Sequence, residues 1–299
     1  MRKVFKWLVI VMAGLVGIVL LLALAGYLIT EQRFNKTYAL ADESLALPTD
    51  VASVAEGQRL VSIRGCTDCH SADLGGKMLI DDPMLGSIPS ANLTRGQGSA
   101  TVAYTVADWE RAIRHGVGPG GRGLLIMPSY EFSGLSDEQV AQMIAYLRTV
   151  SPVDRVAAEP VLKPFGRALF LAGQVPLMPA EKVDQNMVHV VSVPAEASTD
   201  YGAYLSTTCT GCHQSNLAGG VVPGSAPDAP LSANLTPGGH LGNWTLEDFK
   251  NTLRNGVTPE GKVLDPQVMP WPITAQMTDV EIEALWLFLQ SLPPAMPPG

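Results

Sequence analysis

The longest uninterrupted apolar stretch of the chain lies near its N-terminus. Residues Trp7 to about Ile29 carry no charge, and Arg2, Lys3 and Lys6 precede them. At about 1.5 Å rise per residue, a helix of this length crosses a bilayer core of roughly 30 Å. We therefore predict a single transmembrane anchor over residues 1–30. Its basic flank belongs on the cytoplasmic side, so the remainder of the chain lies on the other side of the membrane.

A cleaved signal peptide is the alternative interpretation of this stretch. The string "ALA" at Ala23–Ala25 has the small-residue spacing of a cleavage site. The apolar run continues through Tyr27, Leu28 and Ile29, which is long for a signal peptide and favours an uncleaved anchor. With either interpretation the body of the protein is exported. We expect a single-pass protein of a bacterial inner membrane with its folded part in the periplasm.

The rest of the chain shows the apolar spacing of helices and no convincing strand alternation. The clearest helix begins at Ser136 with the capping-box string Ser-Asp-Glu-Gln, and Val140, Ile144 and Leu147 then fall on one stripe. Other helices are predicted after Thr49 or Asp50, over about 106–114, within the "GRALFLAG" string at 166–173, and after Thr278. The pattern therefore predicts a mainly α protein.

An internal repeat divides this helical part into two similar halves, offset by about 142 residues. The string "SANLT" occurs at Ser90–Thr94 and again at Ser232–Thr236, and the residues that follow Asp108 resemble those that follow Asp248. We therefore predict a tandem repeat of two domains. The predicted order is an anchor at 1–30, a juxtamembrane spacer at 31–48, a first domain at 49–152, an ordered connector at 153–197 and a second domain at 198–299.

Composition and charge narrow the possible functions. Hydrophobic residues make up 46% of the 299 residues and charged residues 16%, a balance typical of folded chains. The net charge is −8, and no run of Lys and Arg occurs beyond the first few residues. This pattern argues against a nucleic-acid-binding protein.

All four cysteines lie in two five-residue strings, "CTDCH" at Cys66–His70 and "CTGCH" at Cys209–His213. A disulfide within either pair would close only a tiny loop and would stabilise the fold little. A thioredoxin-type redox pair requires a preceding strand and leaves the histidine unexplained. A zinc site built from both strings has suitable ligands, but neither repeat would hold a complete site by itself.

Covalent haem attachment explains every shared residue of the two strings. Residues i and i+3 of a helical turn face the same way, so the two cysteines of each string can bond the two vinyl groups of one haem. The histidine that follows then presents its imidazole to the iron. We therefore predict two covalently bound haem c groups, held by Cys66, Cys69, His70, Cys209, Cys212 and His213.

A second axial ligand is expected on the opposite face of each iron. Met127 and Met269 follow the two strings at nearly equal distances, and each is followed by a proline. A thioether on a loop stiffened by proline can reach the iron, whereas the other methionines lack a counterpart in the other half. The predicted iron ligands are His70, Met127, His213 and Met269.

The remaining polar and aromatic candidates are assigned from the repeat. His115 is expected to cap or pack, and His189 and His240 are expected at the surface. Trp109 and Phe249 are expected to pack on a haem edge or in the core. Candidate partners of the haem propionates are Asn92, Thr94, Arg114, Asn234, Thr236 and Arg254.

Each half resembles a class I cytochrome c in its order of N-terminal helix, CxxCH string, Met-Pro loop and C-terminal helix. That resemblance implies that the first and last helices of each half cross where a small residue meets an aromatic one. The implied pairs are Gly57 with Tyr146 and Gly202 with Phe288.

The whole chain resembles membrane-anchored dihaem c-type cytochromes and the cytochrome subunits of periplasmic alcohol and gluconate dehydrogenases. The strings "CTGCH", "SANLT", "RAIRHGV" and "MPSY" carry this likeness. Those subunits have three haems as a rule, whereas this chain has two attachment strings. The resemblance implies redox protein partners, namely a dehydrogenase or quinol-oxidising complex on one side and an oxidase or soluble cytochrome on the other.

The predicted ligands also define the expected function. An iron with histidine on one face and methionine on the other has no open site for a substrate, so no catalytic residue is predicted. Methionine ligation and burial raise the reduction potential. We expect an electron carrier rather than an enzyme, moving single electrons between a dehydrogenase or quinol-oxidising complex and a terminal acceptor. The alternative is a dihaem enzyme with one open haem, of the peroxidase or thiosulfate dehydrogenase type. The latter uses a cysteine as distal ligand, and no cysteine remains here for that role.

Overall fold

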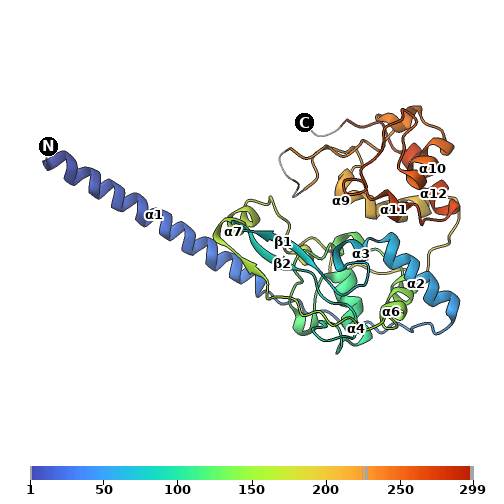
Figure 1. Cartoon of the computed structure of the whole chain (residues 1–299), viewed down its shortest axis with the longest axis horizontal. Coiled ribbons are helices and arrows are strands. Elements are labelled where there is room, and N and C mark those ends of the chain that lie inside the picture. The colour runs from blue at the N-terminus through green and yellow to red at the C-terminus, as the bar shows by residue number, and fades with distance from the viewer. Residues whose placement is uncertain (1, 224, 226–227, 297–299) are drawn as a thin grey trace.

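The computed structural model describes residues 2–223, 225 and 228–296 of the chain. Helix α1 (Arg2–Phe34) projects away from the folded body as one continuous helix (Figure 1). It is long and apolar enough to cross a membrane, and Thr30 is its one buried residue among those described. The helix continues past the predicted anchor boundary at residue 30. The predicted mainly helical class with one N-terminal apolar helix is confirmed.

Each half of the body is built on a pair of crossing helices. In the first half α2 (Val51–Ile63) crosses α6 (Asp137–Leu147), and in the second α8 (Thr199–Ser206) crosses α12 (Asp279–Ser291). A Cβ atom on Gly57 would stand 2.0 Å from the carbonyl oxygen of Gln142, so only glycine permits this approach.

Gly202 occupies the same position in the second helix pair. A Cβ atom there would stand 2.0 Å from the carbonyl oxygen of Ala284 and 2.6 Å from Cβ of Phe288. In the first half, Cβ of Tyr146 lies 3.1 Å from the corresponding point on Gly57. Both predicted glycine–aromatic crossings are therefore confirmed.

Side-chain caps explain where these helices begin. Asp50 accepts a hydrogen bond from the backbone N–H of Ser53, and Thr278 forms a reciprocal capping box with Glu281. Ser136 caps α6 as predicted, but Gln139 does not complete the box. Its side-chain oxygen instead accepts a hydrogen bond of 2.7 Å from the hydroxyl of Tyr204 in the second half. The predicted capping box at Ser136 is therefore wrong in this half.

Shorter elements connect the crossing helices. In the first half they are α3 (Cys66–His70), α4 (Val106–Glu110), the π-helix η1 (Arg111–His115), the 3₁₀ turn η2 (Pro119–Gly121) and α5 (Ser129–Phe132). In the connector they are α7 (Pro164–Leu171) and η3 (Pro179–Glu181). In the second half they are η4 (Thr207–Cys209), α9 (Thr210–His213), η5 (His240–Asn243), α10 (Leu246–Asn255) and α11 (Trp271–Thr274).

A small antiparallel sheet corrects the expectation that the chain has no strands. Its order is β1 (Met78–Asp82), β2 (Gly86–Pro89) and β3 (Val161–Leu162). The strands are too short for an alternating pattern to register in the sequence, and β3 comes from the connector. Gly86 has φ of 120° and no side chain, which lets the backbone of β3 approach β2 closely as its antiparallel partner.

The two halves share one hydrophobic core. Leu60 and Ile144 from the first half belong to the same buried cluster as Leu205 and Ile282 from the second. At the edge of this core Arg59 donates two hydrogen bonds of 2.8 Å to the carboxylate of Glu281. Figure 1 shows the second half stacked on the side of the body that carries α2 and α3.

A smaller cluster lies where α1 joins the body. Phe170 of α7 stacks on Phe34 with ring centroids 5.3 Å apart, and Leu177 and Met178 of the connector complete the cluster. The helix predicted within the "GRALFLAG" string is thus confirmed as α7, which lies in the segment predicted as the connector.

Candidate functional site

The CxxCH string of the first half forms a single helical turn directly after α2. Gly65, with φ of 72°, lets the chain turn from the end of α2 into α3. In the second half η4 and α9 cover the equivalent residues. All four cysteines have free sulfur atoms. Each pair therefore presents two thiols from one turn, as the haem interpretation requires.

Each histidine of the two strings is oriented by a backbone carbonyl. Nδ1 of His70 lies 2.7 Å from the carbonyl oxygen of Ala91, and Nδ1 of His213 lies 2.7 Å from that of Ala233. A carbonyl oxygen only accepts, so Nδ1 carries the proton and Nε2 keeps its lone pair. Burial lowers the pKa of both imidazoles, which favours the neutral, metal-binding form.

The serine of the repeated "SANLT" string holds the other end of the attachment turn. The hydroxyl of Ser90 donates a hydrogen bond of 2.7 Å to the carbonyl oxygen of Cys69. The hydroxyl of Ser232 makes the same bond, also 2.7 Å, to Cys212. Together with the alanine carbonyl, this string fixes both the cysteine turn and the histidine ring in each half.

The asparagine and threonine of the string hold the chain that leaves each helix pair. The side-chain amide of Asn92 donates to the carbonyl oxygen of Val153 at 2.7 Å, and that of Asn234 donates to Ala295 at 2.7 Å. Their side-chain oxygens accept from Thr94 and Thr236. These groups, predicted as propionate partners, are engaged with the protein itself.

The matched arginines brace the start of the last helix in each half. Arg114 is fully buried, and its Nη2 lies 2.7 Å from a carboxylate oxygen of Asp137. Nη2 of Arg254 lies 2.7 Å from a carboxylate oxygen of Asp279. Both arginines therefore have an architectural role, and their contact with a haem propionate stays a prediction.

The two predicted methionine ligands lie on loops of the same backbone conformation. Pro128 has φ of −79° and ψ of 55°, and Pro270 has φ of −75° and ψ of 59°. These angles define an inverse γ-turn, closed by a 2.7 Å hydrogen bond to the carbonyl oxygen of Met127 or Met269. Both methionines are half-buried and pack against the shared core. As iron ligands they remain predictions.

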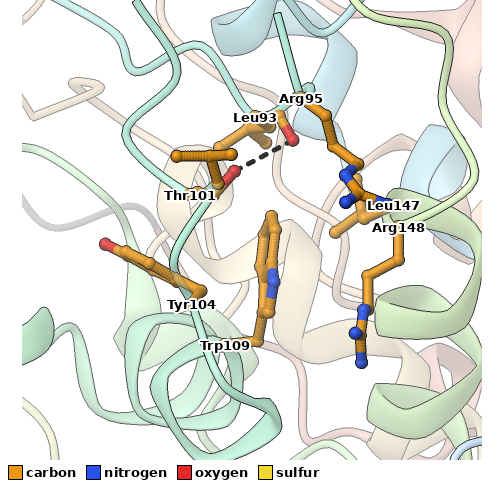
Figure 2. Close-up of a pocket in the computed structure, with 8 residues that line it drawn as sticks. Leu93, Arg95, Thr101, Tyr104, Trp109, Leu147 and Arg148 are labelled. Carbon is orange, nitrogen blue, oxygen red and sulfur yellow. Dashed lines mark hydrogen bonds between the residues drawn. The ribbon is translucent and has the colours of Figure 1, made fainter.

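Trp109 belongs to the core of the first half. It is 5% exposed, and its indole meets the ring of Tyr104 edge to face with centroids 5.5 Å apart. Figure 2 shows the indole between Tyr104 on one side and Leu147 and Arg148 on the other, in a small pocket. Phe249 is buried in the second half. Both aromatic residues therefore pack in the core, which is one of the two roles expected for them.

The structure disfavours the alternative uses of the cysteines. Helices, not strands, precede both strings, unlike the thioredoxin arrangement. Burial raises the pKa of the Cys66 thiol to about 12 and that of Cys209 to about 11. Redox-active and zinc-binding cysteines act as thiolates, which a raised pKa suppresses. The donor set therefore fits haem c, with two thiols and a free imidazole nitrogen in each half.

The three other histidines differ from one another in burial. His115 packs inside and lies 2.8 Å through Nδ1 from the side-chain oxygen of Gln185, in line with its expected packing role. The side chain of His240 is 79% exposed, as expected. The side chain of His189 is only 4% exposed, so its expected surface position is wrong. The connector folds back over the first half and buries it.

The two attachment strings lie close to each other across the boundary between the halves. Arg64, one residue before Gly65, donates a hydrogen bond of 3.1 Å to the hydroxyl of Thr208, which directly precedes Cys209. The carboxylate of Glu131 lies against Gly211 of the second string. Burial raises the pKa of Glu131 to about 7. Sequence patterns gave no signal for this junction, because its members are far apart along the chain.

Residues 54–151 match the family model of cytochrome c, which makes the first half a cytochrome c domain. A domain of this family carries covalently bound haem c for electron transport. The chain is also similar over most of its length to cytochrome c subunits of dehydrogenases, so the resemblance seen in the sequence is confirmed.

Three relatives illustrate this similarity. The cytochrome c subunit of alcohol dehydrogenase (quinone) from Komagataeibacter europaeus is 29% identical over 305 residues, covering 89% of this chain and 63% of the relative. The fructose dehydrogenase cytochrome subunit of Gluconobacter japonicus is 27% identical, covering 81% and 53%. A diheme cytochrome c-type protein of Cereibacter sphaeroides is 27% identical, covering 80% and 86%. The chain thus spans less than two thirds of the length of each of the two dehydrogenase subunits.

Proposed function

We propose that this chain is a membrane-anchored dihaem cytochrome c that passes single electrons from a dehydrogenase or quinol-oxidising complex to a terminal acceptor. The observation that carries the proposal is the paired histidine geometry. In both halves the imidazole Nδ1 is held 2.7 Å from an alanine carbonyl oxygen, which leaves Nε2 available to iron. The same arrangement twice in one chain supports two haem groups.

The family match covers residues 54–151, and the local structure of the second half supports it as a second cytochrome c domain. It repeats the helix crossing at Gly202, the serine and asparagine bonds of the "SANLT" string, and the inverse γ-turn at Pro270. Each feature is matched in residues 54–151, where the family is identified. A shared set of local bonds at a constant offset is expected of a duplicated domain.

Bound to these residues, haem c supplies a one-electron ferric–ferrous couple. Cys66 and Cys69 would tether it in the first half, and Cys209 and Cys212 in the second. His70 and His213 would be the proximal ligands, with Met127 and Met269 on the opposite face. His213 is buried and His70 is half-buried, and the carbonyl bonds fix the tautomer and orientation of both rings.

The junction between the halves supports electron transfer within the chain. Arg64 bonds to Thr208, so the residues just before Cys66 and Cys209 touch each other. Arg64 is 3% exposed, and its guanidinium also lies 5.5 Å from the ring centroid of Tyr204. This packing holds the two attachment strings at a constant separation. A constant, short separation is what transfer between two fixed redox centres requires.

Helix α1 supports the anchor and the periplasmic location. Its C-terminal turn docks on α7, where Arg167 donates to Glu31 at 2.7 Å and to the hydroxyl of the buried Thr30. The anchor and the body therefore form a continuous structure. With the basic residues before Trp7 on the cytoplasmic side of a bacterial inner membrane, both halves would face the periplasm.

The partners follow from the relatives and remain part of the proposal. Relatives named as cytochrome c subunits of alcohol and fructose dehydrogenases favour a dehydrogenase as electron donor. An oxidase or a soluble cytochrome would then be the acceptor.

Spectroscopy of methionine variants tests the proposal. We expect a pyridine haemochrome assay of the exported full chain to give two haem c per chain. The oxidised protein should show the far-red methionine–iron band. Met127→Leu and Met269→Leu should each remove about half of that band, because each breaks one of two iron–sulfur bonds. Met84→Leu is the control, since Met84 is 60% exposed and has no counterpart in the second half.

Two results would contradict the proposal. Full persistence of the band in both Met127→Leu and Met269→Leu would reject these ligands, and one haem per chain would reject the second domain. Carbon monoxide added to the reduced protein separates the carrier from the enzyme. A carrier with both irons fully coordinated should bind little, whereas binding at half of the haem would indicate one open site.

A further inference from the structure

Four side chains with metal-binding chemistry meet at a place that the haem sites do not use. We name Glu43, Glu110, His115 and His189 the histidine–glutamate cluster. Glu43 lies in the spacer, Glu110 and His115 end α4 and η1, and His189 lies in the connector. The cluster therefore joins three segments that are distant in the sequence.

Three members of the cluster are close enough to share one ion. Glu43, Glu110 and His189 each offer one ligand atom, and these atoms lie within 4.8 Å of one another. Nδ1 of His189 is 3.5 Å from a carboxylate oxygen of Glu43. The fourth member, His115, lies beside these three residues, with its Nε2 3.5 Å from a carboxylate oxygen of Glu110. One imidazole with two carboxylates is a donor set that suits a divalent transition-metal ion.

Burial leaves two polar atoms of the cluster without partners. The side chain of Glu110 is 0% exposed and that of His189 is 4% exposed. Within the described part of the chain, neither Oε2 of Glu110 nor Nε2 of His189 has a hydrogen-bond partner. Buried polar atoms in folded proteins almost always have a partner, which can be protein, water or an ion. These two atoms therefore point to a ligand.

The local charge favours a cation. Arg114 faces three carboxylates: its Nη1 is 3.4 Å from Glu110 and 3.5 Å from Glu43, and its Nη2 is 2.7 Å from Asp137. One guanidinium cannot balance three carboxylates. The two contacts to Glu43 and Glu110 are also longer than ordinary hydrogen bonds. The two positive charges of a divalent cation would complete the balance.

Comparison of the two halves shows that the cytochrome fold does not require this cluster. Lys250 stands at the position of Glu110 in the second half, and Asn255 stands at that of His115. The backbone also differs, because η1 is a π-helix whereas α10 is a regular α-helix throughout its length. Short π-helical segments are rare and occur frequently at functional sites.

We propose that the histidine–glutamate cluster binds one divalent transition-metal ion of the Zn²⁺ class. Glu43, Glu110 and His189 are the ligands, and His115 is a fourth donor at the side. The ion links the spacer and the connector to the first domain. This site is independent of the haem groups and of the proposed electron transfer.

Zinc titration of the holoprotein tests the site. The detergent-solubilised full chain is treated with EDTA, which leaves covalent haem in place, and ZnCl₂ is added in a calorimeter near neutral pH. We expect one tight site per chain. Glu43→Gln and His189→Gln should each weaken zinc binding at least about tenfold, since even indirect partners of a metal ligand contribute that much. Glu43 is 43% exposed, so its variant is expected to fold.

Matched controls separate this site from weak surface binding. His240 and Glu260 form an exposed pair with a 3.6 Å separation, and His240→Gln should leave zinc affinity unchanged. The visible haem spectrum checks that each variant is folded. The proposal is overturned if the wild-type chain binds no zinc equivalent. It is also overturned if Glu43→Gln and His189→Gln bind zinc as tightly as the wild type, or if His240→Gln removes the tight site.

Discussion

Replacing Gly57 by alanine should force the first and last helices of the first half apart. The new Cβ would stand 2.0 Å from the carbonyl oxygen of Gln142, and real Cβ atoms essentially never come within 3.0 Å of another heavy atom. The helices must therefore separate by about 1 Å. The contact is with backbone, which cannot rotate away, so the overpacking cost is expected near ~3 kcal/mol. Alanine has a higher helix propensity than glycine by ~1 kcal/mol, so the net loss in the free energy of unfolding is ~2 kcal/mol.

Thermal unfolding followed by circular dichroism measures this loss. A change of ~2 kcal/mol corresponds to a Tm lower by about 4–8 °C for a body of this size. Gly202→Ala should behave alike, because its Cβ would also stand 2.0 Å from a carbonyl oxygen. Gly134→Ala is the control, with no heavy atom within 4 Å of its Cβ. Equal Tm values for Gly57→Ala and Gly134→Ala would refute the close crossing.

Two further predictions concern the junction and the repeated string. Burial raises the pKa of Glu131 from 4.5 to about 7. Between these pH values the folded state therefore binds more protons than the unfolded state, and stability should fall as pH rises through that window. Glu131→Gln should flatten this part of the Tm–pH profile and stabilise the protein above pH 7 by at most about 3 kcal/mol. A variant with an unchanged Tm–pH profile would contradict the burial of this carboxyl group. Asn92→Ala should cost ~2 kcal/mol, because Asn92 is buried and its side-chain oxygen accepts hydrogen bonds from the N–H and the hydroxyl of the fully buried Thr94. Asn234→Ala should cost less, since Asn234 is only half-buried, and equal losses in thermal unfolding would contradict this difference.

Features set by short-range patterns could be predicted from the sequence. Asp50 and Ser136 cap their helices as expected, because a cap depends on residues three positions apart. The crossings at Gly57 and Gly202 followed from a resemblance to a known fold, and the geometry of both is now explicit. The attachment strings could be identified from the spacing of their cysteines and histidine alone.

Features that depend on distant partners could not be predicted. The "SANLT" string reads as a set of polar residues, and the sequence does not reveal that Asn92 reaches Val153. His189 was expected at the surface because it lies in the connector. Its burial comes from Glu43 and His115, which lie far away in the sequence. The strand β3 was missed for the same reason, since its partner β2 belongs to another segment.

Comparison of the two halves distinguishes the residues that the shared fold requires from those that serve another purpose. A requirement of the shared fold acts on both halves, and it accounts for the matched bonds of Ser90 and Ser232. It does not account for Glu110 and His115, which are replaced in the second half. The spacer and the connector supply Glu43 and His189 to the first half. The unmatched residues therefore occur where these extra segments dock, which is the position expected of an ion that fastens them to the domain.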